Sequence, residues 1–445
     1  MSAQEATATS DRPDLSIEIA ALLPVLARIA DREAVVLCLA DTLACALGAE
    51  ALADKHGGTV SRLRGLSPSA GGAATIWATG EKADTDTAAL RNAVAARYLD
   101  WNDTYVARAI IHPSDLLAAL VALAEERAIA WDRLIEAAGV VYEVVCRMAD
   151  QADLRRRGFD GSTLSPIGAA AGAAWLLSLD EEASARALRI AALDAATLRA
   201  VRQGKLSDWK AIASARGALK GLFAARMAEA GFLAPDNVYG GDEGFLATVS
   251  GPLALDAEGG SRMTRIILKA HPAQIFIQGM LQLAAELRPR LADRLDSIQS
   301  VTVHTFKQAV DMVGGKAHPV GAAMNRETAD HSAAFAIAAV LAAGRLGHAD
   351  FERLLSDATV HRLIGRTNVE EDAAANRAFP VRFSSRITVA LDDGTVLAAE
   401  QDNPVPLRPQ DLSAKFAELW PPHLARGWRW DLPGAAPRFP VGHND

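Results

Sequence analysis

From residue 17 to about residue 262 the chain is a succession of long apolar runs separated by short polar breaks. Four runs keep apolar side chains around the whole circumference of a helix, namely residues 34–47, 116–128, 134–148 and 167–177. A helix that is apolar on every side has to be buried on every side. These runs therefore predict one compact helical domain, in which the first of the four helices ends at Gly48.

The pattern changes after Gly259-Gly260. Residues 300–306 alternate between polar and apolar, as a half-buried strand does. Residues 386–400 alternate on both sides of Asp393-Gly394, a dipeptide typical of a tight hairpin turn. Helical patterns flank these strands at residues 272–287 and 332–346. This part of the chain is expected to mix helices with a sheet.

The expected fold is mainly α, because 445 residues are too many for one ordinary core and most of the chain has helical patterns. We expect a large all-helical domain over residues 15–262, completed by residues 402–445. A smaller α+β lid domain is expected over residues 263–401.

Composition narrows the kind of partner. Half of the residues are apolar, and alanine, the best helix former, dominates them. The net charge of -8 and the pI near 5.7 argue against a nucleic-acid surface, which needs a basic stripe. The expected partner is a small molecule.

Nothing in the chain predicts a secreted or membrane-spanning protein. Cys38, Cys45 and Cys146 lie within apolar helical runs and form no metal or disulfide pattern, so buried thiols are expected. Residues 1–14 lack the features of a signal peptide, and no run reaches the roughly eighteen uninterrupted apolar residues of a membrane span. We expect a cytoplasmic enzyme or binding protein.

One short stretch carries more polar chemistry than packing needs. Between two apolar helical runs, sixteen residues contain Asp100, Asn102, Asp103, Thr104, His112 and Asp115. A carboxylate and an imidazole in one cleft can divide the roles of general base and general acid. Histidine titrates near neutral pH, so a proton-transfer reaction is expected here.

Three further segments are rich in functional side chains: residues 202–210, 269–274 and 325–331. The first places Lys205 and Lys210 just before an expected helix over residues 213–231, where the helix dipole does not favour cations. A clamp for a di- or tricarboxylate would explain them better. His271, Gln274 and His331 belong to the other two segments.

Each of these residues also has an ordinary interpretation. Asp103, Thr104 and Ser114 could be helix caps. Arg202 and Lys205 could be solvated, and His271 or His331 alone could be structural. Trp101 and Trp209 are expected to be core anchors rather than binding platforms. The functional interpretation therefore depends on several segments meeting in space.

Recognised metal and cofactor motifs are absent from the sequence. There is no HExxH, no cysteine cluster, no phosphate-binding GxxxxGK[ST], no GxGxxG between a strand and a helix, and no GxSxG. The sequence therefore predicts neither a metal nor a cofactor, and acid-base chemistry by side chains alone.

The motifs in these segments resemble those of the MmgE/PrpD family, over about residues 34–412. They are Asp41-Thr-Leu-Ala-Cys-Ala-Leu-Gly48, Arg97-Tyr-Leu-Asp-Trp-Asn-Asp-Thr-Tyr105, His112-Pro-Ser-Asp115, Trp209-Lys210, Lys220 to Ala225, Gly240 to Phe245, Lys269-x-x-Pro272 and Arg326-Glu-Thr-Ala-Asp-His-Ser332. The resemblance implies a large helical domain, a smaller α+β lid domain, a homodimer and a metal-free active site between the domains. It also implies that Asp100, Thr104, His112, Lys210 and Lys269 lie where the family places catalytic or carboxylate-binding side chains.

Four positions depart from the family pattern. Gln274 stands where the family usually has Glu or His, and Phe276 where it has His. Gly161 occupies the place of a histidine, and Phe335 that of a common tyrosine. Each change removes a group that can carry a proton, and losing one such group typically costs a factor of about a hundred to ten thousand in rate.

The sequences of the motifs are most similar to those of the family's methylcitrate dehydratase branch. This implies a cofactor-independent hydro-lyase that eliminates water from a small hydroxy-polycarboxylate such as 2-methylcitrate. The expected catalytic residues are Asp100, His112, Lys210 and Lys269, with the first two as the acid-base pair and the lysines gripping carboxylates. The expected substrate-binding residues are Asn102, Asp103, Thr104, His271, Gln274 and His331.

Two alternatives stay open at this point. An isomerase, epimerase or decarboxylase of a related di- or tricarboxylate needs one base and a carboxylate clamp but no acid for a leaving hydroxyl. The departures at Gly161, Gln274 and Phe276 favour this alternative somewhat. A catalytically silent paralogue that only binds carboxylates is the other, and its ligands would raise its melting temperature without turnover.

Overall fold

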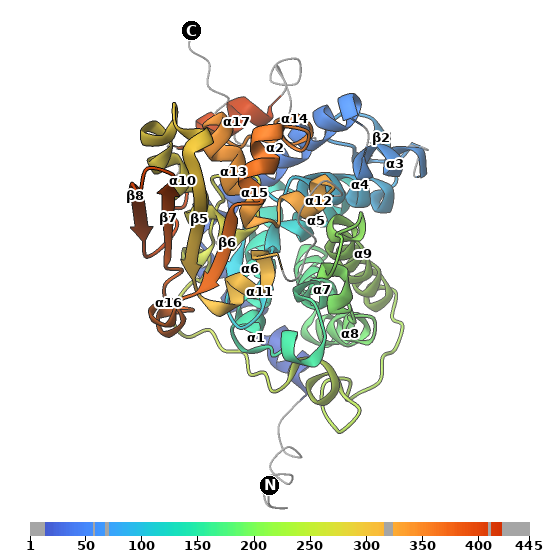
Figure 1. The fold of residues 1–445 in the computed structure, drawn as a ribbon. Helices are drawn as coiled ribbons and strands as arrows, with labels where there is room; N and C mark the ends of the chain where they lie inside the picture. The colour runs from blue at the N-terminus through green and yellow to red at the C-terminus, as the bar shows by residue number, and fades with distance from the viewer. Residues whose placement is uncertain (1–13, 57, 67–70, 316–323, 408–410, 421–445) are drawn as a thin grey trace, which may run out of the picture.

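A computed structural model describes residues 14–56, 58–66, 71–315, 324–407 and 411–420 of the chain. The structure is mainly helical, as expected, and its sheet of four strands lies in the C-terminal part. Figure 1 shows this sheet on one side of the molecule and helices α7, α8 and α9 on the other.

Within the described residues, the larger part contains nine α-helices: α1 Leu15–Ile29, α2 Arg32–His56, α3 Thr59–Leu66, α4 Thr85–Tyr98, α5 Leu117–Glu126, α6 Trp131–Gln151, α7 Ser165–Leu176, α8 Glu181–Leu193 and α9 Trp209–Glu229. Helix α7 packs against α6, α8 and α9 at the centre of one continuous apolar core. Small residues allow this close packing, since a Cβ atom at Gly221 of α9 would lie 2.5 Å from the Ala169 side chain of α7. The alanine-rich composition therefore packs helices tightly.

The prediction that the first apolar helix ends at Gly48 is wrong. Helix α2 continues through Gly48 to His56. A Cβ atom at this glycine would lie 2.4 Å from the Leu419 side chain, so the glycine lets α17, Leu412–Leu419, pack closely against α2. The missing side chain serves a contact between distant segments and does not end the helix.

The sheet has the order β6-β5-β7-β8, from strands β5 Ile298–Thr305, β6 Thr367–Glu371, β7 Ser385–Leu391 and β8 Val396–Gln401. Strands β5 and β6 are parallel, and the other neighbours are antiparallel. The expected hairpin is confirmed: β7 and β8 meet at Asp393-Gly394, where Gly394 has a positive φ of 84°. Helices α10 Gln278–Leu291, α13 Ala333–Ala343 and α15 Ala358–Ile364 form a second apolar core with the sheet.

Short elements complete the described chain. The strands are β1 Ala74–Thr75, β2 Lys82–Ala83, β3 Tyr105–Val106 and β4 Ile110–Ile111. The helices are α11 Lys307–Val313, α12 Arg326–Ala329, α14 Phe351–Leu354 and α16 Ala373–Ala378. The boundaries of the two expected domains stay a prediction, although α17 does pack on α2, where Lys415 pairs with Asp41 at 2.5 Å.

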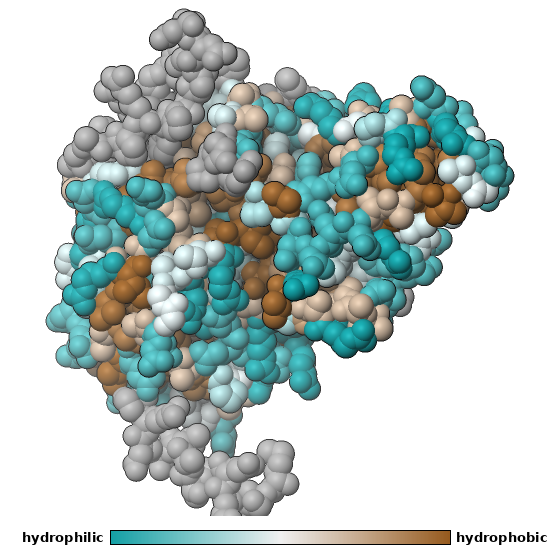
Figure 2. Space-filling model, turned by 90° about the vertical axis from the view of Figure 1, so that its left-hand side faces the viewer, coloured by the Kyte–Doolittle hydropathy of each residue, from teal (hydrophilic) through white to brown (hydrophobic). Residues whose placement is uncertain are grey.

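Among the described residues, one helix is long and apolar enough to cross a membrane by length and composition alone. It covers residues 32–53 within α2, and 83% of its most apolar window is buried inside the protein, as in a core helix. Figure 2 views the side on which Figure 1 shows β8, and hydrophilic residues cover most of this face, with hydrophobic ones in separate groups between them.

Candidate active site

The loop between α4 and α5 brings the first group of predicted residues together. Asp100 follows α4 with a positive φ of 51°, a conformation that aspartate adopts more readily than most residues. The β3–β4 hairpin then folds the chain back, so that the His112 Nδ1 atom lies 2.7 Å from the Asp103 carbonyl oxygen. Thr104 pairs with Ile267 through two backbone hydrogen bonds, and this bridge draws in the segment that carries Lys269.

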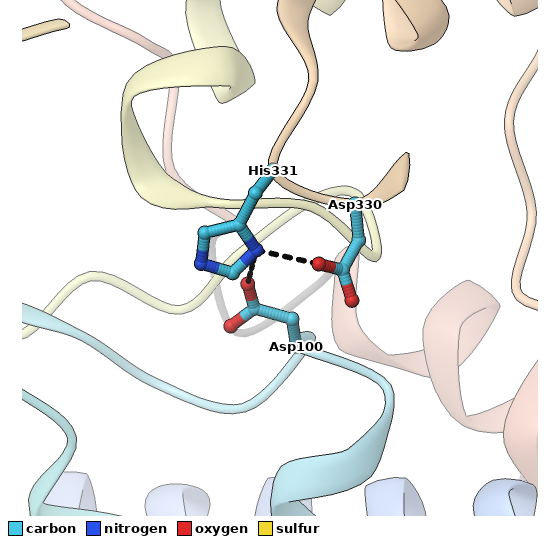
Figure 3. A group of neighbouring side chains, drawn as sticks. All are labelled: Asp100, Asp330 and His331. Carbon is cyan, nitrogen blue, oxygen red and sulfur yellow. Dashed lines mark hydrogen bonds and ion pairs between the residues drawn. The ribbon is translucent and has the colours of Figure 1, made fainter. Parts of the chain in front are cut away.

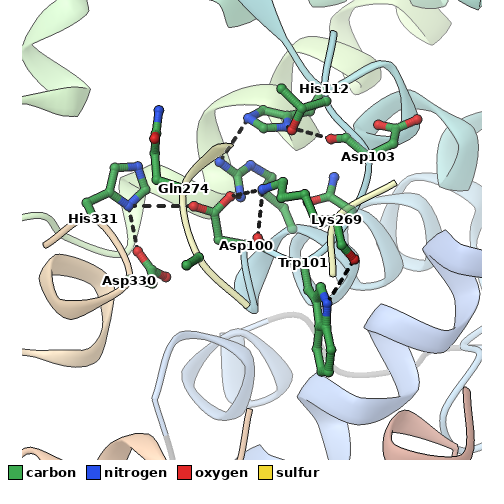
Figure 4. Close-up of polar contacts among 12 residues, drawn as sticks. Asp100, Trp101, Asp103, His112, Lys269, Gln274, Asp330 and His331 are labelled. Carbon is green, nitrogen blue, oxygen red and sulfur yellow. Dashed lines mark hydrogen bonds and ion pairs between the residues drawn. The ribbon is translucent and has the colours of Figure 1, made fainter. Parts of the chain in front are cut away.

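Asp100 is held by two cations. Its Oδ1 atom accepts a hydrogen bond from Arg97 at 2.5 Å and another from the Lys269 ammonium group at 2.8 Å (Figure 4). Its Oδ2 atom is buried, has no hydrogen-bond partner, and lies 3.6 Å from Nδ1 of His331. One oxygen of this carboxylate is therefore fixed, and the other is available.

A second charged group lies beside the first. Asp330 follows α12, and its Oδ1 atom lies 2.5 Å from Nδ1 of His331 (Figure 3). Its Oδ2 atom accepts a hydrogen bond from the Lys210 ammonium group. Lys210 also pairs with Glu327 at 2.9 Å. The arrangement joins α9 to the segment around α12, which are more than a hundred residues apart in sequence.

These surroundings decide which groups are charged. Arg97, Lys269 and Lys210 hold the pKa of Asp100 well below its usual range, although burial acts in the opposite direction. Burial lowers the pKa of His112 well below its usual value, and lowers that of His331 to about 4 despite the nearby carboxylates. At neutral pH the site therefore contains an ionised carboxylate and two neutral imidazoles.

The tautomer of His112 follows from its neighbours. A carbonyl oxygen can only accept, so Nδ1 carries the hydrogen and donates to the backbone of Asp103. Thr104 Oγ1 lies 3.1 Å from the same nitrogen, and the Arg97 guanidinium lies 3.3 Å from Nε2. His112 thus presents an acceptor, not a donor, at Nε2.

Asn102 and Asp103 form hydrogen bonds with other buried residues and do not line the pocket described below. The Asp103 carboxylate accepts hydrogen bonds from Ser114 Oγ at 2.6 Å and Tyr142 at 2.5 Å, and Asn102 donates to Ser114 and Asp115. Burial raises the pKa of Asp103 to about 6. Asp103 also accepts the backbone N–H of Ser114, which resembles the capping role considered for it.

A pocket with a cavity of about 90 Å³ opens over Asp100 and His112. Gln274 and His331 also line it, so four of the ten predicted site residues meet there. Side chains from both apolar cores contribute to its wall, for example Leu116 and Ile275. The pocket therefore lies where the helical part meets the sheet-containing part.

The two lysines expected to grip a substrate lie outside this wall. Lys210 and Lys269 are fully buried, and their ammonium groups bond the protein's own carboxylates. A buried ion pair needs both partners, so these lysines are positioned to hold Asp100 and Asp330. Gripping a substrate carboxylate stays a prediction that this geometry does not favour.

His271 is set apart from the other predicted residues. It does not line the pocket, and the charged group that acts on its pKa is Glu418 of α17. Burial lowers the pKa of His271 to about 4. Its partly buried position outside the pocket fits the alternative interpretation of a structural histidine, and a role in binding substrate stays a prediction.

Sequence reasoning named no arginine as a site residue. The pocket is nevertheless lined by Arg97, Arg108, Arg155, Arg199 and Arg202. Arg202, expected to be solvated, instead pairs with Asp160 at 3.1 Å and is largely buried. The available signal was the basic run of residues 155–157 just before the segment that contains Gly161.

The two tryptophans have different environments. Trp101 is 3% exposed and is a core anchor, as expected. Trp209 is 46% exposed, so the same expectation is wrong for it, because α9 starts at this residue and turns its indole outward while Lys210 is buried. The helix itself begins at Trp209 and not near residue 213.

The departures from the family pattern have physical reasons. A Cβ atom at Gly161 would lie 2.0 Å from the carbonyl oxygen of Ile110, so the β4 backbone excludes any side chain here. Phe276 is buried in a cluster of rings with Phe306, Phe379 and Phe383. Phe335 packs against Phe351 inside the second core and does not line the pocket.

In the part of the chain that the structure describes, one group of side chains has the spacing of a metal site. Ligand atoms of Asp100, Asp330 and His331 lie within 4.8 Å of one another. Both carboxylates, however, already pair with buried lysines, and Asp100 also pairs with Arg97. A metal ion here would have to displace or repel three buried cations, so these residues fit a cation poorly.

Comparisons with known proteins cover both parts of the chain. The MmgE/PrpD N-terminal domain matches residues 27–257, and the MmgE/PrpD C-terminal domain matches residues 271–429. A 2-methylcitrate dehydratase of Cupriavidus necator is 27% identical over 81% of this chain and 78% of its own length. A 2-methylcitrate dehydratase of Escherichia coli (strain K12) is 25% identical over 80% and 78%.

A mitochondrial 2-methylcitrate dehydratase of Yarrowia lipolytica (strain CLIB 122 / E 150) is more distant, at 24% identity over 68% of this chain and 62% of its own length. All three relatives therefore carry the same printed activity at low identity. The two domain matches together include most of the residues, and the chain belongs to the MmgE/PrpD family.

Proposed function

We propose that the chain is a hydro-lyase that removes water from a small hydroxy-polycarboxylate, of the kind that its 2-methylcitrate dehydratase relatives are named for. The observation that carries this proposal is the Oδ2 atom of Asp100, which has no hydrogen-bond partner and belongs to a residue that lines an arginine-rich pocket. Asp100 is ionised, and its other oxygen is fixed by Arg97 and Lys269. A fixed carboxylate with one free oxygen can act as a general base.

The proposed reaction breaks a carbon–hydrogen bond next to a substrate carboxylate. Asp100 Oδ2 takes the proton, and the electron pair left on carbon forms a carbon–carbon double bond. The carbon–oxygen bond on the neighbouring carbon breaks, and the hydroxyl departs as water after it gains a proton. The products are one unsaturated acid and one water molecule, so no oxidant or further reactant is needed.

The source of the second proton follows from the resting site. Asp100 is ionised, and His112 exposes an acceptor at Nε2, so neither offers a proton to the leaving hydroxyl at the start. The group that removes the proton from carbon therefore becomes an acid during turnover. We infer that it returns this proton to the departing hydroxyl, which requires both bonds to break on the same face of the substrate.

Positive charges in the pocket wall would stabilise the negatively charged substrate that forms when the proton is removed. Removing the proton places negative charge on the substrate carboxylate and its neighbouring carbon, and fixed cations stabilise such charge. Arg97 and Arg202 lie in the pocket wall and are held by Asp100 and Asp160. Because they are already oriented, they need little rearrangement when the charge develops. In this proposal Arg97 and Arg202 interact with the substrate carboxylate, the role first expected of Lys210 and Lys269.

The test is a screen of small di- and tricarboxylates, 2-methylcitrate and citrate among them, by proton NMR in deuterated water. Elimination gives alkene signals, and we expect Asp100→Asn, which removes the proposed base, to lower its rate by about a hundredfold or more. Asp103→Asn is the matched control, since it makes the same change on the same loop outside the pocket and should keep most of the rate. Equal rates in both variants would remove Asp100 from the mechanism.

One observation favours a second candidate, an isomerase or epimerase of a related acid. In the resting site Asp100 and His112, two of the titratable groups that line the pocket, are both acceptors, and exchange of a proton at carbon needs only one acceptor. The same NMR screen separates the two functions. Deuterium incorporation at a substrate carbon without alkene or loss of carbon dioxide would support this candidate over elimination.

A further inference from the structure

Among the described residues, two arginines on the wall of the pocket have no ion-pair partner of their own. Arg155 belongs to a short 3-10 helix at Arg155–Arg157, and Arg199 to another at Arg199–Arg202. Both line the same pocket as Asp100. Forty-four positions separate them in the chain, so their approach results from the fold and not from the local sequence.

Backbone pairing holds the two segments side by side. The Arg199 N–H donates to the Gly158 carbonyl oxygen at 2.8 Å, and the Asp160 N–H donates to Thr197 at 2.9 Å. Phe159 and Leu198 form a bridge between these two bonds. The backbones on which the two guanidinium groups stand are therefore fixed relative to each other before any ligand binds.

The nearby carboxylates are already paired with other cations. Asp160 pairs with Arg202 at 3.1 Å, Asp311 with Lys307 at 3.0 Å, and Asp153 with Arg108 at 3.1 Å. Within the described part of the chain, no carboxylate lies within 4 Å of either Arg155 or Arg199. One terminal nitrogen of Arg155 is buried and has no hydrogen-bond partner.

Unpaired, partly buried cations raise the free energy of the empty site. Burial lowers the pKa of both arginines, and the positive charges of Arg155 and Arg202 lower that of Arg199 further. The more distant carboxylates of Asp311 and Asp160 oppose these shifts but do not reverse them. Like charges that face one pocket repel each other, and an anion between them would remove both this repulsion and the unsatisfied hydrogen-bonding capacity. Guanidinium groups bind carboxylates well because two parallel N–H donors match the two oxygens.

We propose that Arg155 and Arg199 form an anion-binding subsite that holds a substrate carboxylate not attached to the reacting carbons. The subsite and the proton-transfer groups share one pocket, so its ligand needs a carboxylate at the reacting end and another beyond it. This defines the substrate class as an acid with at least two, and by preference three, carboxylates. That the bound acid is also turned over depends on the proposed function, whereas the binding itself does not.

Binding is tested without turnover. Tricarballylate, a tricarboxylate that lacks a hydroxyl group and cannot lose water, is titrated into the full chain by calorimetry. We expect Arg155→Gln and Arg199→Gln each to weaken binding by about ten- to a hundredfold, because a hydrogen-bonded charge pair is lost. The unliganded melting temperature of each variant should stay equal or rise, since a repulsion is removed.

The matched control is Arg156→Gln. Arg156 adjoins Arg155, does not line the pocket, and has a side chain that is 83% exposed. This variant should bind tricarballylate like the original chain, although it loses the same net charge. Equal weakening in all three variants would indicate a long-range charge effect and would overturn the subsite.

The other possible outcomes of the titration would overturn the proposed subsite or its role in binding the substrate. If the original chain binds inorganic phosphate as tightly as tricarballylate, with the same loss in the two variants, the arginines bind any small anion and the substrate role is overturned. If the variants bind tricarballylate as well as the original chain, or if the original chain does not bind tricarballylate, the subsite is overturned. None of these results decides the proposed elimination, which the NMR screen tests separately, and elimination could fail while the subsite holds.

Discussion

Asp100 and Asp103 lie three residues apart on one loop, and the regions around them differ sharply. The pocket side surrounds Asp100 with Arg97, Lys269 and the neighbouring Lys210. The inner side surrounds Asp103 with the hydroxyl groups of Ser114 and Tyr142. Both carboxylates are buried, yet the pKa of Asp100 is lowered and that of Asp103 is raised to about 6.

The difference shows that burial alone does not decide the charge of a carboxylate. Burial raises the pKa of both aspartates, but only Asp100 has enough fixed cations nearby to reverse the shift. The pocket side can therefore perform proton transfer at neutral pH. The inner side joins the loop to α6 through Tyr142. One loop thus carries a reactive carboxylate and a structural one.

The strongest test of this comparison replaces each aspartate by its amide. Asp100→Asn is expected to lower turnover by a factor of about a hundred to ten thousand, because the proposed base is removed. It also leaves Arg97 and Lys269 without their shared counter-charge, which costs about 3 to 5 kcal/mol of folding stability.

Asp103→Asn is the matched control for that variant. It keeps the size of the side chain and should leave turnover within about tenfold, since Asp103 does not line the pocket. Turnover by NMR and urea unfolding of both variants check the pair of predictions. Equal loss of turnover in the two variants would contradict the division between the two sides of the loop.

Lys269→Met distinguishes a structural lysine from a substrate clamp. Because the Lys269 ammonium group bonds the carboxylate and the backbone carbonyl of Asp100, its loss should cost about 3 to 5 kcal/mol in the free energy of unfolding. Denaturant unfolding with and without tricarballylate measures the effect. A variant of unchanged stability that no longer binds tricarballylate would show that the lysine grips the ligand after all.

The raised pKa of Asp103 predicts a smaller, pH-dependent effect. Between about pH 4 and pH 6 the unfolded carboxyl loses its proton while the folded one keeps it, so its contribution to stability falls as pH rises through this window. His112 and His331, whose pKa values are lowered, act in the opposite direction as pH rises.

Asp103→Asn isolates the contribution of that aspartate. The variant should gain about 2 to 3 kcal/mol relative to the original chain between pH 4 and pH 7, because the original chain alone loses this contribution. Unfolding free energies of both proteins at several pH values check this. A difference that does not change with pH would mean that Asp103 is ionised in the folded protein.

Chelation should have the smallest effect. The carboxylates of Asp100 and Asp330 are paired with buried lysines, so we expect turnover to stay unchanged after treatment with EDTA. Loss of activity that Mg²⁺ or Mn²⁺ restores would contradict this, and would mean that the three-residue group at Asp100, Asp330 and His331 binds a metal despite the nearby cations.

Local patterns predicted most of the elements but not their ends. Periodicity located α5, α6 and α7, and alternation located β5 and the β7–β8 hairpin. Gly48 was taken as a helix end, whereas its role depends on Leu419, some 370 residues later in the chain. The residues next to Gly48 in the sequence give no information about this contact. From those neighbours alone, a glycine that ends a helix cannot be told from a glycine at which two helices cross.

The candidate site was predicted in part for a similar reason. A dense polar stretch between apolar runs pointed to Asp100 and His112, and both line the pocket. Lys210 and Lys269 were singled out because their positive charge suits a carboxylate, but the carboxylates they bind belong to the protein. Arg155 and Arg199 were missed, since each segment alone resembles solvated surface.

The sequence by itself determined the helical class, the change to a sheet after residue 260, the family, and the loop that carries Asp100 and His112. These features depend on neighbours within a few turns of helix or a few residues of strand. Only the tertiary structure decided which cations face the pocket and which are buried against protein carboxylates. Ionisation depends on distances between side chains that are remote in sequence, and the folded chain sets those distances.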